Sequence, residues 1–237
     1  MMNPPESETP TIVVIEDEAA IRKFLRISLE AHGYRVEEAR LGADGILLCT
    51  RNVPDLVILD LGLPDMDGKN VIARLRDWSR VPIVVLSVRS DEQQKVAALD
   101  AGANDFVTKP FGISELLARL RVLLRNRDLP NREEAVYSAG GLRVDLGGRR
   151  VFLAGQETHL TPKEFNLLRV LVRNRGSVLT HQQLLTAVWG PDGVAETQNL
   201  RVLVAALRHK LGEDPSSPRY VVTEPGVGYR FGAEQAD

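Results

Sequence analysis

The residues DLVILDLGLPDMDG, at positions 55–68, decide the fold of the first half of the chain. The apolar run at residues 56–59 leads directly to one carboxylate, Asp60, and turn-forming residues follow at once. A short aliphatic run bounded by such residues is typical of a buried parallel strand. Asp60 would then lie at the carboxyl end of that strand, where open α/β sheets place their chemistry. The alternative is an Asp that only caps the following loop.

Further apolar runs alternate with helical patterns on both sides of this stretch. Strands are expected at residues 11–15, around Val36, at 81–86 and at 105–108. Helices are expected at residues 18–33, with Phe24 on the apolar stripe, around 46–48 and 71–75, at 91–101 and at 116–124. Strands and helices that alternate at this spacing predict five βα units around a parallel sheet, which is an α/β fold.

Polar residues end several of the expected strands. Glu16 and Asp17 follow the first strand, Asp60 the third, Ser87 the fourth and Lys109 the fifth. Taken singly, such residues can be helix caps, turn residues or solvated charges. Because the carboxyl ends of parallel strands meet at one edge of a sheet, their coincidence favours a single site.

The residue types at this edge suit phosphoryl transfer. Three carboxylates invite a hard divalent cation, Mg²⁺ before Zn²⁺, because neither His nor Cys is close by in the pattern. An Asp beside a cation and a lysine stays ionised and can act as a nucleophile, while Ser87 and Lys109 would bind phosphoryl oxygens. The chain has no glycine-rich nucleotide loop, so the phosphoryl group is expected from another molecule. An aspartyl-phosphate phosphatase is the enzymatic alternative, but it requires a second carboxylate two residues after Asp60, where this chain has Gly62.

Residues 11–127 resemble the receiver domains of two-component response regulators, which have a doubly wound, flavodoxin-like fold. The set Glu16-Asp17, Asp60, Ser87 and Lys109-Pro110 carries this resemblance. It implies that Asp60 is the phosphoacceptor for a sensor histidine kinase and that the protein itself is not an enzyme. It also implies a cis Lys109-Pro110 bond and an Mg²⁺ site formed by Glu16, Asp17, Asp60 and the carbonyl of Gly62. Phe106 would be the aromatic switch residue.

The resemblance further implies a homodimer on activation. Lys95, Asp105, Glu115 and Arg119 match charged positions that pair across a symmetric dimer in the winged-helix branch of this family. Asn104 departs from that branch, which often has an acidic residue there. The alternative is a solvated face whose exposed ion pairs contribute ~0–1 kcal/mol each.

Composition separates the chain into two parts and limits its environment. The chain has 237 residues, enough for two domains. Residues 1–130 carry 17 Lys/Arg and 20 Asp/Glu, a balance of −3, whereas residues 135–233 carry 12 and 8, a balance of +4. A basic second half favours a polyanionic partner.

Residues 128–137 are expected to be a linker, and residues 138–233 a second domain. No apolar run approaches the ~20 residues that cross a bilayer, and the single Cys49 excludes an internal disulfide, so the cytoplasm is the expected location.

The second domain begins with short strands, expected at residues 142–145 and 150–153, and continues with three helices. Thr161, Pro162 and Glu164 form a capping box with proline at the first helical position. Thr180 and Gln183 form a second capping box. The third helix, at residues 196–211, is amphipathic, and a hairpin of residues 220–223 and 229–231 follows it. This order predicts a winged helix-turn-helix domain, whose third helix enters the major groove of DNA.

The motifs LTPKEFNLL, Trp189-Gly190 and GVGYR at residues 226–230 resemble the effector domain of the OmpR/PhoB family of response regulators. The resemblance implies that Arg201 and Arg208 contact the major groove or clamp phosphates, and that Arg230, with Tyr229, contacts the DNA backbone beside the wing. Ala205 and Ala206 depart from members that have arginine there. The complete set of expected DNA contacts is Gln198, Arg201, Arg208, His209, Tyr229 and Arg230.

A finer resemblance, carried by LDLGLPD, FGISELLARLRV, VWGP and GVGYRF, is to the branch that regulates potassium-transport genes. The leading hypothesis is therefore a transcription factor controlled by phosphorylation, with double-stranded promoter DNA, a sensor kinase and RNA polymerase as candidate partners and no membrane partner. The alternatives are a regulator of a different set of genes and a DNA-binding protein with a vestigial receiver.

Overall fold

The computed structural model describes residues 9–88, 92–127, 136–190, 196–214 and 216–232. The chain forms two compact units, divided between Leu124 and Arg125. Residues 128–135 of the expected linker lie outside the described residues, and the first strand of the second unit begins at Val136. In the described segments, none of the helices combines the length and the apolar character that crossing a membrane would need.

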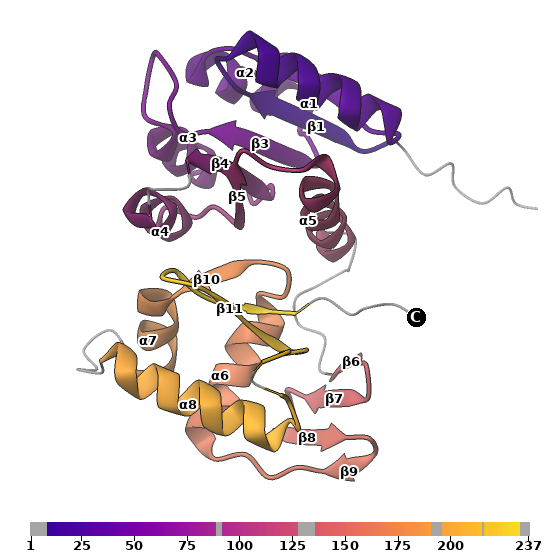
Figure 1. Cartoon of the computed structure of the whole chain (residues 1–237), viewed down its shortest axis with the longest axis vertical. Coiled ribbons are helices and arrows are strands. Elements are labelled where there is room, and N and C mark those ends of the chain that lie inside the picture. The colour runs from indigo at the N-terminus through magenta and orange to yellow at the C-terminus, as the bar shows by residue number, and fades with distance from the viewer. Residues whose placement is uncertain (1–8, 89–91, 128–135, 191–195, 215, 233–237) are drawn as a thin grey trace, which may run out of the picture. The chain divides into compact units, whose positions relative to one another are not determined.

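The first unit alternates strands and helices along its described residues (Figure 1). Its strands are β1 (Thr11–Ile15), β2 (Arg35–Ala39), β3 (Leu56–Asp60), β4 (Ile83–Val88) and β5 (Asp105–Lys109). Its helices are α1 (Ala19–Ala31), α2 (Gly42–Asn52), α3 (Gly68–Arg76), α4 (Glu92–Asp100) and α5 (Ile113–Arg127). All strand pairs are parallel, in the order β2-β1-β3-β4-β5. This is the flavodoxin-like order, so the prediction of a doubly wound α/β domain is confirmed.

Helices cover both faces of this sheet because alternate strand residues point to opposite sides. On one face, Ile12, Val14 and Ile58 pack with the leucines of α1 and α5. On the other face, Ile15 is so close to α2 that a side chain on Gly45 would overlap it. The central strands β1 and β3 are therefore almost completely buried; the two partly buried residues are Thr11, which begins β1, and Asp60, which ends β3.

Two details of the first unit differ from the sequence-based expectation. β4 begins at Ile83 rather than at residue 81, because Pro82 has no N–H to donate to a neighbouring strand. Phe24 does not lie in the core: its residue is 44% exposed, and its ring faces Phe111 at a centroid distance of 6.5 Å. Phe24 and Phe111 line a pocket of about 560 Å³ that also includes Lys109.

In its described residues, the second unit has two small antiparallel sheets and three helices that pack against one another (Figure 1). One sheet contains β6 (Val136–Ala139), β7 (Leu142–Asp145), β8 (Arg150–Leu153) and β9 (Gln156–Glu157). The other has the order β10-β12-β11, with β10 (Val178–Thr180), β11 (Val221–Glu224) and β12 (Gly228–Phe231). The helices are α6 (Pro162–Arg173), α7 (His181–Trp189) and α8 (Thr197–Lys210). Helix α8 is followed by the β11–β12 hairpin, the expected order of a winged helix-turn-helix.

Side chains fix the starts of two of these helices. Thr161 accepts a hydrogen bond from the backbone of Glu164, whose carboxylate accepts one from the Thr161 N–H in return. Thr180 and Gln183 form the same reciprocal pair. Both predicted capping boxes are confirmed. Three strands were not expected: β6 begins inside the residues assigned to the linker, and β9 and β10, with two and three residues, are too short to show an alternating pattern.

Candidate functional site

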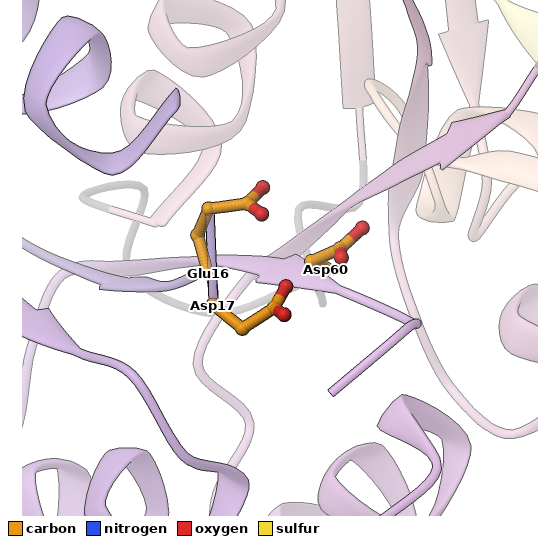
Figure 2. Close-up of side chains that lie close together, drawn as sticks. All are labelled: Glu16, Asp17 and Asp60. Carbon is orange, nitrogen blue, oxygen red and sulfur yellow. The ribbon is translucent and has the colours of Figure 1, made fainter. Parts of the chain in front are cut away.

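Three carboxylates meet at the carboxyl edge of the first unit's sheet. Glu16 and Asp17 follow β1, and Asp60 is the last residue of the neighbouring strand β3. Each offers an oxygen that lies within 4.8 Å of those offered by the other two. Figure 2 shows the three side chains extending toward the same region from these two strands. The structure therefore brings together the carboxylates that the sequence predicted to be neighbours.

Lys109, at the end of β5, reaches across the edge to two of these carboxylates. Its Nζ lies 2.9 Å from Glu16 Oε2 and 3.1 Å from Asp60 Oδ1. The Glu16 side chain is fully buried, and those of Lys109 and Asp60 are only 16% and 13% exposed. The following Lys109-Pro110 bond is cis, as expected. An ammonium shared by two carboxylates at the edge of a sheet is a strong electrostatic arrangement because little water screens it.

The charges at this edge remain unbalanced after that pairing. Burial raises the pKa of Glu16; the hydrogen bond from Lys109 opposes the rise, and the charge of Asp60 adds to it. Burial acts to lower the pKa of Lys109, but its hydrogen bonds to Glu16 and Asp60 and their charges outweigh this and raise it. Three carboxylates against one ammonium leave an excess of negative charge, which a divalent cation with oxygen ligands would neutralise. The donor set of Glu16, Asp17 and Asp60 therefore fits Mg²⁺.

Ser87 and Gly62 occupy the remaining predicted positions of the site. In the β3–β4 register, Asp60 lies opposite Leu86, so Ser87 is the next residue along the neighbouring strand. Its Oγ is buried and has no hydrogen-bond partner among the described residues. A buried hydroxyl that lacks a hydrogen-bond partner destabilises the folded state, and a ligand oxygen that accepts a hydrogen bond from it would remove this cost. At Gly62, an added Cβ would lie 3.5 Å from Asp60 Oδ2, so this backbone runs beside the carboxylate.

Sequence reasoning missed two residues that hold the loops of this site. The Arg22 guanidinium donates to the carbonyl oxygens of Glu16 and Asp17, at 2.7 and 3.1 Å. Asp65, in the loop after Asp60, accepts hydrogen bonds from the first N–H groups of α2, at Gly42 and Ala43. Those bonds lower the pKa of Asp65. The N-cap residue of α2 is Leu41, whose side chain cannot accept a hydrogen bond from the first N–H groups of the helix. This absence of a local cap is the one signal in the sequence that an acceptor must come from elsewhere in the chain.

The expected switch residue and dimer residues lie on and around β5. Phe106 is buried, and the Lys95 ammonium lies over its ring at 5.2 Å. Arg119 binds Asp105 at 3.1 Å and Glu115 at 2.9 Å within the same chain. Asp105 is fully buried, so its contact with Arg119 is more than a solvated surface pair. The four residues predicted for the dimer face thus make contacts inside one protomer, and their pairing across a dimer stays a prediction.

Helix α8 presents a polar face away from the core of the second unit. Leu200, Val204 and Leu207 are buried on its inner side. The expected DNA contacts Gln198, Arg201 and His209 are exposed. These three side chains are therefore accessible to a ligand that lies along the outside of the helix.

The other three predicted DNA contacts are held within the second unit. The Arg208 guanidinium donates to the carbonyl oxygen of Val221 on β11 at 3.0 Å and to Thr223 Oγ1 at 2.8 Å. Tyr229 is buried, and this burial raises its pKa. Arg230 pairs with Glu224 across the β11–β12 hairpin. In this arrangement Arg208 connects α8 to the wing, whereas Arg201 is exposed.

Comparison with known proteins agrees with both units. The family model "Response regulator receiver domain" matches residues 12–121, and "Transcriptional regulatory protein, C terminal" matches residues 155–231. The "KDP operon transcriptional regulatory protein KdpE" of Escherichia coli strain K12 is 51% identical over 93% of this chain and 98% of its own length. The "Transcriptional regulatory protein KdpE" of Mycobacterium tuberculosis is 49% identical over 94% of this chain and 99% of its own. The "Transcriptional regulatory protein KdpE" of Staphylococcus aureus is 38% identical over 93% of this chain and 96% of its own length.

These relatives span both units, and they are named as transcriptional regulators. A receiver-type sheet with an acidic edge and a DNA-binding effector unit thus occur together in one chain. The chain belongs to the OmpR/PhoB-type response regulators of two-component systems, with the KdpE proteins among its relatives.

Proposed function

We propose that this regulator accepts a phosphoryl group on Asp60 from a sensor histidine kinase. The observation that carries this is the Lys109 ammonium between the Asp60 and Glu16 carboxylates, with the unpartnered Ser87 Oγ on the next strand. An anionic ligand beside Asp60 would meet one ammonium and one hydroxyl donor. Both donors are supplied by strands of one rigid sheet, so they require little rearrangement.

The reaction is a direct displacement at phosphorus. An Asp60 oxygen forms the new P–O bond as the P–N bond to the kinase histidine breaks, and that nitrogen recovers its ring electrons. Lys109 and Ser87 stabilise the charge on the transferring oxygens, while Asp60 needs no general base because it is already a carboxylate. Mg²⁺, held by Glu16, Asp17, Asp60 and the Gly62 carbonyl, would neutralise the negative charge that repels the incoming group.

The consequence for the rest of the receiver unit follows from its contacts. A phosphoryl group on Asp60 would attract the Lys109 ammonium and accept a hydrogen bond from the Ser87 hydroxyl. Phe106 lies on β5, the strand that carries Lys109. We propose that Phe106 transmits this change to Lys95, which lies over its ring. The ion pairs within the chain on this charged face would then break and form again with a second protomer. The residues of the face are Lys95, Asp105, Glu115 and Arg119. The dimer would place two α8 helices on paired DNA half-sites.

Replacing Arg201 is expected to change DNA affinity alone, whereas replacing Arg208 is expected to change both DNA affinity and the stability of the second unit. Arg201→Ala removes an exposed donor and should weaken specific DNA binding by about 1–3 kcal/mol, with an unchanged unfolding midpoint. Arg208→Ala should weaken binding and also destabilise the second unit by about 1 kcal/mol, because its hydrogen bonds to β11 are lost. Fluorescence anisotropy and thermal unfolding measure the two effects. Arg173→Ala, at an exposed arginine of α6, is the matched control. Unchanged DNA affinity in both variants would remove these residues from the interface.

The relatives also suggest which genes are regulated. Because relatives with 49–51% identity are named KdpE, one of them as a KDP operon regulator, we propose that this protein controls potassium-transport genes. Chromatin immunoprecipitation from the source organism, grown with scarce and with abundant potassium, tests this directly. We expect occupancy upstream of potassium-transport genes. Occupancy confined to other promoters would assign the protein to a different regulon.

A further inference from the structure

One residue at the centre of the outward face of α8 is apolar. Val202 is 60% exposed, although it lies in the middle of the helix. Neither packing nor helix stability accounts for valine here, because an exposed valine buries little area and is a weaker helix former than alanine or arginine. The next residue on the same face, Ala205, is also exposed and adds a methyl group. Helix α8 therefore carries a small apolar strip on its outside.

Polar residues flank this strip on the same side of the helix. At about 100° per residue, Gln198, Val202, Ala205 and His209 lie within roughly 60° of one another, with exposed Arg201 beside them. Arg208, which lies near this face, directs its guanidinium to β11 instead. Along the helix axis, the methyl groups of Val202 and Ala205 therefore occupy the middle of this face, with Gln198 and His209 toward its two ends and the Arg201 guanidinium at its side. Figure 1 shows α8 along the outside of its unit.

We propose that Val202 contacts the 5-methyl group of a thymine in the major groove and thereby determines part of the DNA sequence that is recognised. The inference rests on the proposed role of α8 as the recognition helix. Thymine carries the one apolar group that base edges present in the major groove, so an apolar side chain at the centre of the contact selects it. The positive balance of residues 135–233 and the exposed Arg201 supply the attraction to DNA that a valine lacks. Ala205 is short enough to let the helix approach the bases closely.

The experiment removes single methyl groups from the DNA and from the protein. The full-length chain, treated with acetyl phosphate, first selects duplexes from a random-sequence library. Each thymine of the selected duplex is then replaced singly by deoxyuridine, which lacks only the methyl group, and Kd is measured for each duplex. We expect the wild-type chain to lose about fourfold in affinity at one or two thymines, the effect of one buried methyl group.

Val202→Ala should bind the unmodified duplex more weakly and should no longer distinguish thymine from deoxyuridine at those positions. Val53→Ala, at another highly exposed valine in the first unit, is the matched control and should keep the wild-type profile. The inference is overturned if wild-type binding is indifferent to every thymine methyl group, or if Val202→Ala keeps the wild-type profile. Failure to select any duplex would instead overturn the proposed function, and this inference with it.

Discussion

The Asp60→Asn variant is expected to take up no phosphoryl group. Asparagine has the shape of aspartate, but its amide oxygen is not an anionic nucleophile and cannot form the acyl phosphate. We expect the loss to be complete, because in the proposed mechanism Glu16 and Asp17 only help to hold Mg²⁺ and Asp60 alone attacks phosphorus. Intact-protein mass spectrometry, after incubation with acetyl phosphate and Mg²⁺ and an acid quench, measures the uptake.

Asp67→Asn is the matched control for this substitution. Asp67 lies in the same loop, is exposed, and caps α3 by accepting a hydrogen bond from the Lys69 N–H at 2.8 Å. Asparagine caps helices as well as aspartate does, so this variant should fold and gain the phosphoryl mass like the wild type. If Asp60→Asn gained the phosphoryl mass to the same extent as Asp67→Asn, Asp60 would not be the acceptor.

The Gly228→Ala variant is expected to lose DNA binding while its receiver unit still takes up phosphate. An added Cβ at Gly228 would lie 1.9 Å from the carbonyl oxygen of Leu179 and 2.9 Å from the Cα of Thr180. Both are backbone atoms of β10, so the pairing of β10 with β12 could not persist. Tyr229 and Phe231 on β12 would leave the core with it. We expect a loss of about 3 kcal/mol or more in the stability of the second unit.

Tryptophan fluorescence can follow the unfolding of the second unit alone. The chain has two tryptophans, Trp78 in the first unit and Trp189 in the second, and Trp78 is about half exposed. In a Trp78→Phe background, urea unfolding followed by fluorescence reports on Trp189. Gly147→Ala is the control, since its added Cβ would make only an ordinary contact, 3.6 Å from Asp145 Oδ1. An identical unfolding midpoint for the Gly228 and Gly147 variants would contradict the steric argument.

The main elements of both units could be predicted because their signals are local. An apolar run such as residues 56–59 identifies a buried strand by itself, and Thr161 with Glu164 marks the start of a helix. The acidic site could also be predicted, because parallel strands necessarily bring their carboxyl ends to one edge. That rule places Glu16 beside Asp60 although they are 44 positions apart in the sequence.

Other features could not be predicted because they depend on partners that only the folded chain supplies. The three residues of β10 show no pattern of their own and become a strand by pairing with β12. Arg208 lies on α8 like Arg201, and only the position of β11 directs its guanidinium to Val221. Phe24 fits the apolar spacing of α1, yet it lies at a pocket on the surface. Periodicity cannot distinguish an apolar residue in the core from one at a surface pocket.

The central claim is that a phosphoryl group on Asp60 controls DNA binding by α8. The most direct measurement is a titration of one fluorescent duplex, selected by the wild-type chain, with the protein before and after treatment with acetyl phosphate. Phosphorylated wild type should bind at least about tenfold more tightly, a coupling free energy of about 1.4 kcal/mol, whereas Asp60→Asn should show one affinity under both conditions. Equal affinities of the phosphorylated and unphosphorylated wild-type chain would contradict the account.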